Sequence, residues 1–277
     1  MTNSYETNHQ GCGVVASSFD IRDYKITSMS DLPDEFSTRK VPVKNQYFNS
    51  SCVAFALSTV IEHHYAKLTN SNKRFSTEFI YGYRESNYYI GDGMVIRDAL
   101  KTIKKYGDPF QADCTGNNKY DKAMENINEN VDKLKELAYP HRISAYVKLE
   151  TAEQMKTAIF TNGPIVVSMN WYDDYVLENN IYTYCPSKEY GRHCVVIYGW
   201  NKDGWLVQNS WGVTFGNGGR FIVPYSFKFN EAWGIIDDID DNRFDVVTPS
   251  ENKFIKKIYK AINNVVNFVK NLFKKDK

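Results

Sequence analysis

The sequence has no run of about 18 consecutive apolar residues, so it predicts no transmembrane span. The segment from Met1 to Gln10 is polar and lacks the apolar core of a signal peptide, so we expect no secretion by that route. The cysteines are odd in number, irregularly spaced and without a Cys-x-x-Cys pair: Cys12, Cys52, Cys114, Cys185 and Cys194. This pattern argues against a disulfide framework and against a zinc site. We therefore expect an intracellular, reducing compartment, with a single bridge through Cys12 or Cys114 as the alternative.

The chain as a whole has no excess of one charge. Its 277 residues carry a formal net charge of +1, and 42% of them are hydrophobic and 24% charged. This composition, with 20 Tyr and 16 Phe, excludes a disordered chain, and the length suits one large core or two modest ones. The charge is uneven, because the residues from Glu251 onward hold eight Lys against two acids. That tail carries +6 and the first 250 residues carry −5.

The hydrophobic pattern predicts helices in the first half of the chain and strands in the second. Helical spacing favours helices over Cys52–Leu68, Ile96–Tyr106, Tyr120–Leu137 and Ala152–Phe160. Strand-like runs cover Ile143–Val147, Ile165–Met169, Cys194–Trp200, Trp205–Gln208 and Arg220–Val223. We expect an α+β fold of two subdomains with a site between them. The predicted boundaries are an extension over residues 1–31, a globular domain over 32–250 and a tail over 251–277.

The tail is the second distinctive feature of the sequence. From Phe254, apolar residues recur every three or four positions and the lysines fall largely elsewhere, which predicts a basic amphipathic helix of about 22 residues. Such a helix is typical of binding to an anionic membrane surface or to a groove of a partner protein. The alternative is that it docks on the chain's own surface. We expect no nucleic-acid partner.

Four residues have the chemistry of a cysteine nucleophile and its support. Cys52 begins a predicted helix, where unpaired N–H groups lower the pKa of a thiol from its free value of about 8.5. His193 suits the role of acid and base, and Asn209 follows it across a predicted strand–turn–strand hairpin that returns beside it. The carboxamide of Gln46 and the backbone N–H of Cys52 are donors for an oxyanion.

These residues and their neighbours resemble the papain-like, or cathepsin-like, cysteine peptidases. The likeness rests on residues 43–46, 51–56, 191–193 and 209–212, and it extends over roughly Leu32 to Asp238. It implies a helical N-terminal subdomain, a β-barrel-like C-terminal subdomain and an active-site cleft between them. It also implies that residues 32–250 are the catalytic domain, with Cys52 as nucleophile, His193 as acid/base, Asn209 as its orienting residue and Gln46 as oxyanion donor. Trp211 is implied as a shield over the Asn209–His193 hydrogen bond.

The chain departs from this family next to the nucleophile. The family usually has Cys-Gly-Ser-Cys-Trp there, whereas this sequence has Asn49, Ser50, Ser51, Cys52 and Val53. No complete pair of the family's disulfides is present, which supports a reducing compartment. Val53 in place of Trp removes an aromatic wall, so the shape of the cleft is expected to differ.

The resemblance also implies where a substrate binds. Residues 91–94, including Gly93, match the glycine-rich rim that pairs with a substrate backbone. Met94, Ser168 and Cys194 are then expected to line the main side-chain pocket, with Asp238 at its base. An acidic residue at the bottom of this pocket predicts that a substrate with a basic side chain two residues before the scissile bond is accepted.

The sequence therefore predicts a cysteine endopeptidase that acts on proteins or peptides through an acyl-thioester, without metal or organic cofactor. Another Cys-His acyl transferase or amidase is an alternative, and so is a catalytically silent scaffold of the same fold. Residues 1–31 are expected either near the cleft or, by preference, as a strap behind the domain, since nothing in them marks a processing site. His63 and His64 are interpreted as an exposed helix face, and Glu62 as a solvated carboxylate.

Overall fold

The computed structural model describes residues 11–18, 26–83, 93–114, 120–184 and 189–236. The predicted C-terminal helix, Asp238 and Cys185 lie outside these ranges. In the part of the chain that is described, no helix is long and apolar enough to cross a membrane.

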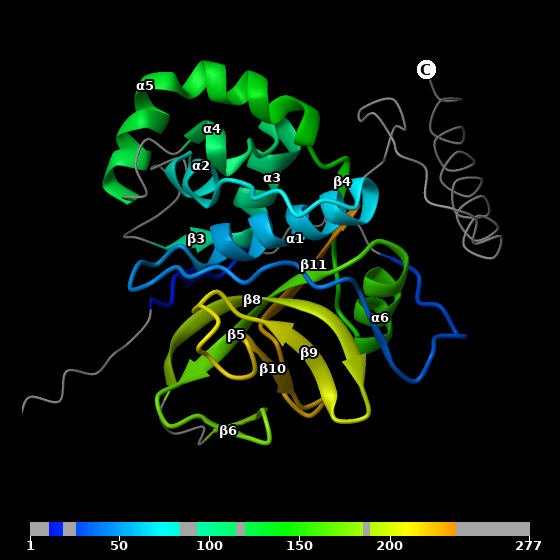
Figure 1. Cartoon of the computed structure of the whole chain (residues 1–277). Coiled ribbons are helices and arrows are strands. Elements are labelled where there is room, and N and C mark those ends of the chain that lie inside the picture. The colour runs from blue at the N-terminus through cyan, green and yellow to red at the C-terminus, as the bar shows by residue number, and fades with distance from the viewer. Residues whose placement is uncertain (1–10, 19–25, 84–92, 115–119, 185–188, 237–277) are drawn as a thin grey trace, which may run out of the picture. The chain divides into compact units, whose positions relative to one another are not determined.

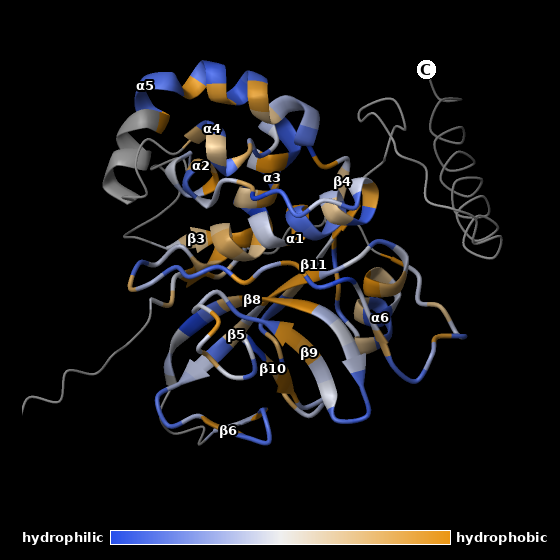
Figure 2. Ribbon diagram, in the orientation of Figure 1, coloured by the Kyte–Doolittle hydropathy of each residue, from blue (hydrophilic) through white to orange (hydrophobic). Residues whose placement is uncertain are grey.

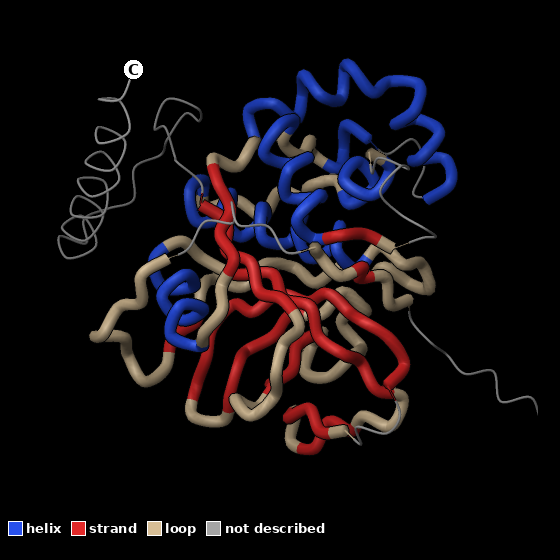
Figure 3. The backbone as a smooth tube through the Cα atoms, turned by 180° about the vertical axis from the view of Figure 1, so that it is seen from behind, coloured by secondary structure: helices blue, strands red, loops and turns tan. Residues whose placement is uncertain are grey.

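Most helices gather at one end of the molecule and most strands at the other, whereas one helix, α6, lies beside the strands, as the tube in Figure 3 shows. The α-helices are α1 (Cys52–Thr69), α2 (Thr77–Gly82), α3 (Ile96–Tyr106), α4 (Gln111–Cys114), α5 (Tyr120–Ala138) and α6 (Ala152–Thr161). A single turn of 3₁₀-helix, η2 (Tyr139–His141), follows α5. Helix α1 lies between the other helices and the strands (Figure 1), and it contacts both α2 and β8.

The strands form one large sheet and one small pair. Nine strands make up the large sheet: β2 (Phe36–Ser37), β4 (Ala145–Lys148), β5 (Ile165–Tyr172), β6 (Val176–Glu178), β7 (Ile181–Thr183), β8 (Glu189–Asn201), β9 (Gly204–Gln208), β10 (Arg220–Val223) and β11 (Glu231–Ile236). Their order is β4-β11-β5-β8-β9-β10-β7-β6, with β2 beside β8. All neighbours are antiparallel except β10 and β7. The small pair joins β1 (Val14–Val15) to β3 (Met94–Val95).

The two faces of the large sheet bury two hydrophobic cores. Because side chains alternate along a strand, Val196 packs with α1 and α3 on one face, while Val195 and Ile197 pack on the other face. The second face holds Trp200 and is covered by α6. Figure 2 shows hydrophobic residues along β9 and β10, and alternating hydrophobic and hydrophilic turns along the outlying helix α5. The sheet therefore fixes β8 between the two cores.

Helix α1 is buried on nearly all sides, which makes the interpretation of three of its polar residues wrong. His63 and His64 are 4% and 7% exposed, and Glu62 is 2% exposed. Other elements cover them: Gly163, at φ +126°, lies so close that a Cβ there would be 3.2 Å from His64 Nε2. Burial lowers the pKa of both imidazoles to about 3. Both rings are therefore buried, and both are neutral at pH 7.

Candidate active site

The thiol of Cys52 lies at the start of α1, where the helix faces strand β8. Cys52 is the first residue of the helix and is fully buried, next to Cys194 in the first hydrophobic core. Burial raises the pKa of the Cys52 thiol to about 11, and hydrogen bonds from the backbone N–H groups of Cys194, Gly13 and Val53 offset only part of that shift. The predicted low pKa is therefore not that of the thiol in this structure.

His193 and Asn209 lie side by side, on β8 and just after β9. His193 Nε2 is 2.8 Å from Asn209 Oδ1. The same oxygen accepts the backbone N–H of Ser210 at 2.8 Å, so it is the carbonyl oxygen of the amide that faces the ring. His193 Nε2 consequently carries the hydrogen, and Nδ1 keeps its lone pair free to take a proton.

Two tryptophans enclose the His193 ring. Trp211 stacks on it with ring centroids 4.6 Å apart and the planes 28° apart. Trp171, on β5, meets it edge to face at 5.4 Å, and it also packs on Trp211 at 4.5 Å. Burial lowers the pKa of His193 to about 4, although the hydrogen bond to Asn209 raises it. The resemblance pointed to Trp211, but nothing in the sequence pattern indicated Trp171.

Gln46 is held in place by the chain segment that carries Asn209. Its backbone N–H donates to Ser210 O at 2.8 Å, and its Oε1 accepts from Ser210 Oγ at 2.5 Å. A bridge between Asn45 and Trp211 and a hydrogen bond from Gly212 N–H to the Lys44 carbonyl extend this contact. Gln46 and Asn209 therefore have a fixed register although 163 positions separate them in the sequence.

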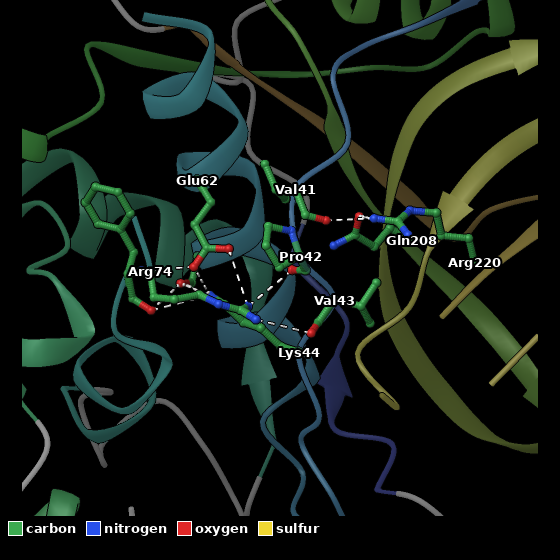
Figure 4. Close-up of polar contacts among 10 residues, drawn as sticks. Val41, Pro42, Val43, Lys44, Glu62, Arg74, Gln208 and Arg220 are labelled. Carbon is green, nitrogen blue, oxygen red and sulfur yellow. Dashed lines mark hydrogen bonds and ion pairs between the residues drawn. The ribbon is translucent and has the colours of Figure 1, made fainter. Parts of the chain in front are cut away.

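The residues before Gln46 are clamped from both sides, as Figure 4 shows. On the helical side, Lys44 forms a 2.8 Å ion pair with Glu62, and Arg74 donates to the carbonyls of Pro42 and Val43. On the sheet side, Arg220 donates to the Val41 carbonyl at 2.7 Å. The charges of Lys44 and Glu62 are buried, and a buried charge is costly unless it is paired. The loop that carries Gln46 therefore stays where Lys44 meets Glu62.

The described N-terminal residues lie directly on this site. Gln46 Nε2 donates one hydrogen to the Asn49 carbonyl and the other to the Gly11 carbonyl, both at 2.8 Å. The Gly13 carbonyl accepts from Met94 N–H at 2.7 Å, and β1 continues as a parallel partner of β3. A peptide carbonyl of the chain itself therefore occupies the predicted oxyanion donor. We call residues 11–18 the N-terminal segment.

The contacts of the extension change along its length. The N-terminal segment ends beside β11 and α3, where Ser17 N–H donates to Glu231 at 2.7 Å and Arg97 donates to the Ser18 carbonyl. Further on, the Ile26 carbonyl accepts from Gln154 of α6, and Met29 N–H donates to Thr157 of the same helix. The sequence favoured a strap behind the domain over a place near the cleft. Residues 11–18 lie at the site instead, whereas residues 26 and 29 contact α6.

The predicted substrate-binding residues come together around the N-terminal segment. A Cβ on Gly93 would lie 2.7 Å from the Gly13 carbonyl, so only glycine permits this approach. Met94, Cys194 and Ser168 are buried nearby, and Ser168 faces Cys194 across the β5–β8 ladder. Asp238 lies outside the described residues. Sequence reasoning missed Glu231, the acidic residue that does lie here, opposite Ser168 on β11.

Cys52 and His193, the predicted nucleophile and base, form no hydrogen bond with each other in this arrangement. No described residue hydrogen-bonds His193 Nδ1. A peptide bound for cleavage would bring its leaving nitrogen within hydrogen-bond reach of that atom, and the N-terminal segment does not. The segment therefore occupies the site without being presented for cleavage. Among the described residues, no group of three or more His, Cys, Asp or Glu is arranged to hold a metal ion.

A helix-borne thiol, an imidazole oriented by an asparagine and a glutamine amide are the groups that a site with a cysteine nucleophile requires. The chain belongs to the papain family of cysteine proteases, since the model of that family (papain family cysteine protease) matches residues 32–232. The predicted family is thereby confirmed.

Two curated proteins illustrate the relationship. The chain is 40% identical over 85 residues to cathepsin B-like cysteine proteinase 5 of Caenorhabditis elegans, which is 29% of this chain and 25% of that protein. It is 28% identical over 205 residues to cathepsin O of Homo sapiens, covering 71% of this chain and 60% of that protein. The matches thus span less than two thirds of the length of these relatives.

Solved structures show the same fold. Xylellain, a cysteine protease from Xylella fastidiosa, is 22% identical, with a TM-score of 0.70 over 85% of this chain and 99% of that one. Digestive procathepsin L 3 of Tenebrio molitor larval midgut is 16% identical, with a TM-score of 0.60 over 83% of this chain and 77% of that one. The predicted α+β papain-like fold is confirmed.

Proposed function

We propose that this protein hydrolyses peptide bonds in proteins or peptides, with Cys52 as nucleophile, and that its N-terminal segment restricts this activity to the fraction of molecules in which the segment is undocked. The observation that supports this best is the Gly11 carbonyl on Gln46 Nε2, at 2.8 Å. It supports the proposal because a peptide carbonyl lies at the amide of the predicted oxyanion donor. Gly11 is an internal residue of the chain, which favours an endopeptidase over an enzyme that needs a chain end.

In the proposed reaction, departure of the segment lets water and substrate reach Cys52. His193 Nδ1 takes the thiol proton, and the Cys52 sulfur forms a bond to the scissile carbonyl carbon. Gln46 Nε2 and the Cys52 backbone N–H stabilise the oxyanion. His193 then protonates the leaving amine from Nδ1, and afterwards activates the water that hydrolyses the thioester. Asn209 keeps the ring in place throughout.

The test compares the full chain with single variants on denatured protein substrates. Cys52→Ala is expected to abolish cleavage. Asn209→Ala is expected to lower kcat/KM by about 5- to 150-fold, since a buried hydrogen bond of this kind contributes about 1–3 kcal/mol. Asn217→Ala, an exposed position, is the matched control. An epoxide-type thiol inhibitor is expected to label Cys52 under reducing conditions.

Two results would replace this proposal. If Cys52 stays unlabelled under reducing conditions even after the segment is displaced, the chain is a silent scaffold of this fold. If the protein hydrolyses small amides but no peptide bonds, it is an amidase. The complete arrangement of Gln46, His193 and Asn209 favours the peptidase over both.

We further propose an intracellular, reducing location and a second binding role for the tail. The cysteines in the described part of the chain, Cys12, Cys52, Cys114 and Cys194, form no disulfide, which is usual in a reducing compartment. The basic pattern of residues 251–277 favours an anionic membrane surface or a partner's groove. Co-sedimentation of the full chain with anionic and neutral vesicles tests the membrane role. Substitution of Lys256, Lys257 and Lys260 by Gln is expected to weaken only the anionic binding.

A further inference from the structure

The N-terminal segment carries a second thiol to the site. Gly11 binds Gln46 through its carbonyl at 2.8 Å, and Gly13 binds Met94 N–H through its carbonyl at 2.7 Å. Cys12 lies between these two anchors, so its backbone is held on both sides. A Cβ added to Gly191, two positions before His193, would lie 3.3 Å from the Cys12 Cβ. Cys12 is therefore fixed between the nucleophile loop and β8.

The glycines around Cys12 show how closely the segment approaches the nucleophile loop. A Cβ on Gly11 would lie 2.3 Å from the Asn49 carbonyl oxygen, and one on Gly13 would lie 1.9 Å from that of Ser50. No residue with a Cβ fits at either place without a shift of backbone. Cys12 is therefore the one residue of this three-residue stretch that has a side chain. Its two neighbours contact Asn49 and Ser50, which lie three and two positions before Cys52.

The electrostatics of the two thiols agree with this proximity. Burial raises the pKa of the Cys12 thiol well above its usual range, and the next largest cause is the charge of a Cys52 thiolate. Like charges act in this way when they lie close together with little water between them. The docked pair is accordingly held as two neutral thiols.

We propose that Cys12 and Cys52 form a reversible disulfide that locks the N-terminal segment over the nucleophile, so that oxidation closes the site and reduction reopens it. The regulatory consequence rests on the proposed peptidase function, whereas the cross-link itself does not. In a reducing compartment the segment is held by its hydrogen bonds alone. When the ratio of oxidised to reduced small thiols rises, the disulfide forms and attaches the segment to the site covalently.

The reaction is thiol–disulfide exchange with a small-molecule disulfide such as oxidised glutathione. When the segment opens, the Cys52 thiolate attacks one sulfur of the small disulfide, which releases one reduced thiol and leaves a mixed disulfide on Cys52. On redocking, the Cys12 thiolate attacks the Cys52 sulfur and expels the second small thiol. Two protein thiols are oxidised to one disulfide, and one small disulfide is reduced to two thiols.

Cys194 is the other thiol beside Cys52, and its place in the fold makes it a poorer partner. It lies on β8, opposite Ser168 in the β5–β8 ladder, and is buried in the first core. A disulfide needs a particular spacing and direction of the two Cβ atoms, and β8 has no freedom to adjust. The N-terminal segment is held by hydrogen bonds to neighbouring loops and to the short strand β3, so a shift of Cys12 toward Cys52 moves no strand of the large sheet, whereas β8 is paired on both sides.

Peptide mapping of the full chain tests the proposal. The protein is equilibrated with glutathione at increasing oxidised fractions, trapped with N-ethylmaleimide and digested with trypsin without reduction. Trypsin separates Cys12 (residues 1–22), Cys52 (45–67) and Cys194 (193–202) into different peptides. We expect peptides 1–22 and 45–67 to appear joined, with the loss of two hydrogens. Peptidase activity should fall in proportion to the joined fraction and return with dithiothreitol.

Variants and alternative products make the outcome decisive. Cys12→Ser is expected to give no joined peptide and to carry glutathione on Cys52 instead, whereas Cys114→Ser, in a core outside the site, behaves as the wild type. Separate glutathione adducts on Cys12 and Cys52 in the wild type, or a join of 45–67 to 193–202, would overturn the proposal. The wild-type map answers the question even if a variant does not fold. A joined pair without any peptide hydrolysis would instead refute the peptidase function alone.

Discussion

Gln46 shows how a single side chain can be oriented before any substrate binds. One hydrogen of its amide holds the Asn49 carbonyl, the other faces the site, and its oxygen is bound by Ser210 Oγ at 2.5 Å. Every polar group of the amide is therefore used, and the site-facing hydrogen has one direction only. An oxyanion donor that needs no reorientation stabilises a transition state more than one that must move.

The first prediction follows at this scale. Gln46→Ala removes an oxyanion donor and is expected to lower kcat by about 10²- to 10³-fold, with a small effect on KM. Ser210→Ala is the matched control, since it removes the contact to the far side of the amide and leaves the site-facing hydrogen. It should cost much less. Steady-state kinetics on a peptide substrate, with the segment displaced, measure both. An equal loss in the two variants would make Gln46 a support of the loop rather than an oxyanion donor.

At the scale of elements, local sequence signals predicted the bounds of helices, but they did not predict which distant segments pair. The predicted bounds of α1, α3 and α6 agree with the structure within one or two residues, because helical spacing and stops such as Gly107 are local features. The pairing of β1 with β3 has no such signal. Each strand is two residues long, and Val14 and Met94 are 80 positions apart. The place of the N-terminal segment therefore depends on tertiary contacts that no periodicity reports.

The second prediction concerns this segment as an element. Gly13→Ala places a Cβ 1.9 Å from the Ser50 carbonyl and should expel the segment from the site. Overpacking of this kind costs about 1–3 kcal/mol, so the undocked fraction, and with it the activity, should rise by about 5- to 150-fold. Alkylation of Cys52 at pH 7 should also become faster, because the thiol regains water and its pKa falls from about 11.

The control for this experiment lies in the same segment. Ala16 is exposed, and Ala16→Ser should leave both activity and alkylation unchanged. If Gly13→Ala alters neither rate while the protein stays folded, the segment does not restrain the enzyme.

For the whole molecule, the sequence indicated the residues of the site but not how deeply the fold buries them. Cys52, His193, Asn209 and Gln46 were predicted from their types and flanks, and the structure pairs His193 with Asn209 and joins Gln46 to Ser210, the residue after Asn209. Burial of His63 and His64 escaped prediction. Polar residues on a helix suggest an exposed face, and only the packing of α1 between helices and sheet excludes one.

That packing gives the molecule a dependence on pH. The folded pKa is about 3 for His63 and His64 and about 4 for His193, against 6.5 in a solvated chain. Between these values the unfolded chain binds more protons than the folded one, so the free energy of unfolding must fall as the pH falls. The contribution of the imidazoles is complete above about pH 6.5 and is lost progressively toward pH 3 to 4. Asp108, whose pKa burial raises, acts with the opposite sign.

The third prediction separates the imidazoles from Asp108 by subtraction. The free energy of unfolding in urea is measured at pH 7.5, 6 and 5 for the wild type and for His64→Gln, which keeps a polar side chain of similar size. The wild type should lose stability steadily over this range. The variant should start less stable and lose less, because one buried imidazole no longer takes up a proton on unfolding while Asp108 contributes equally to both. Parallel pH profiles would mean that His64 is protonated in the folded state, against the burial that the fold imposes on it.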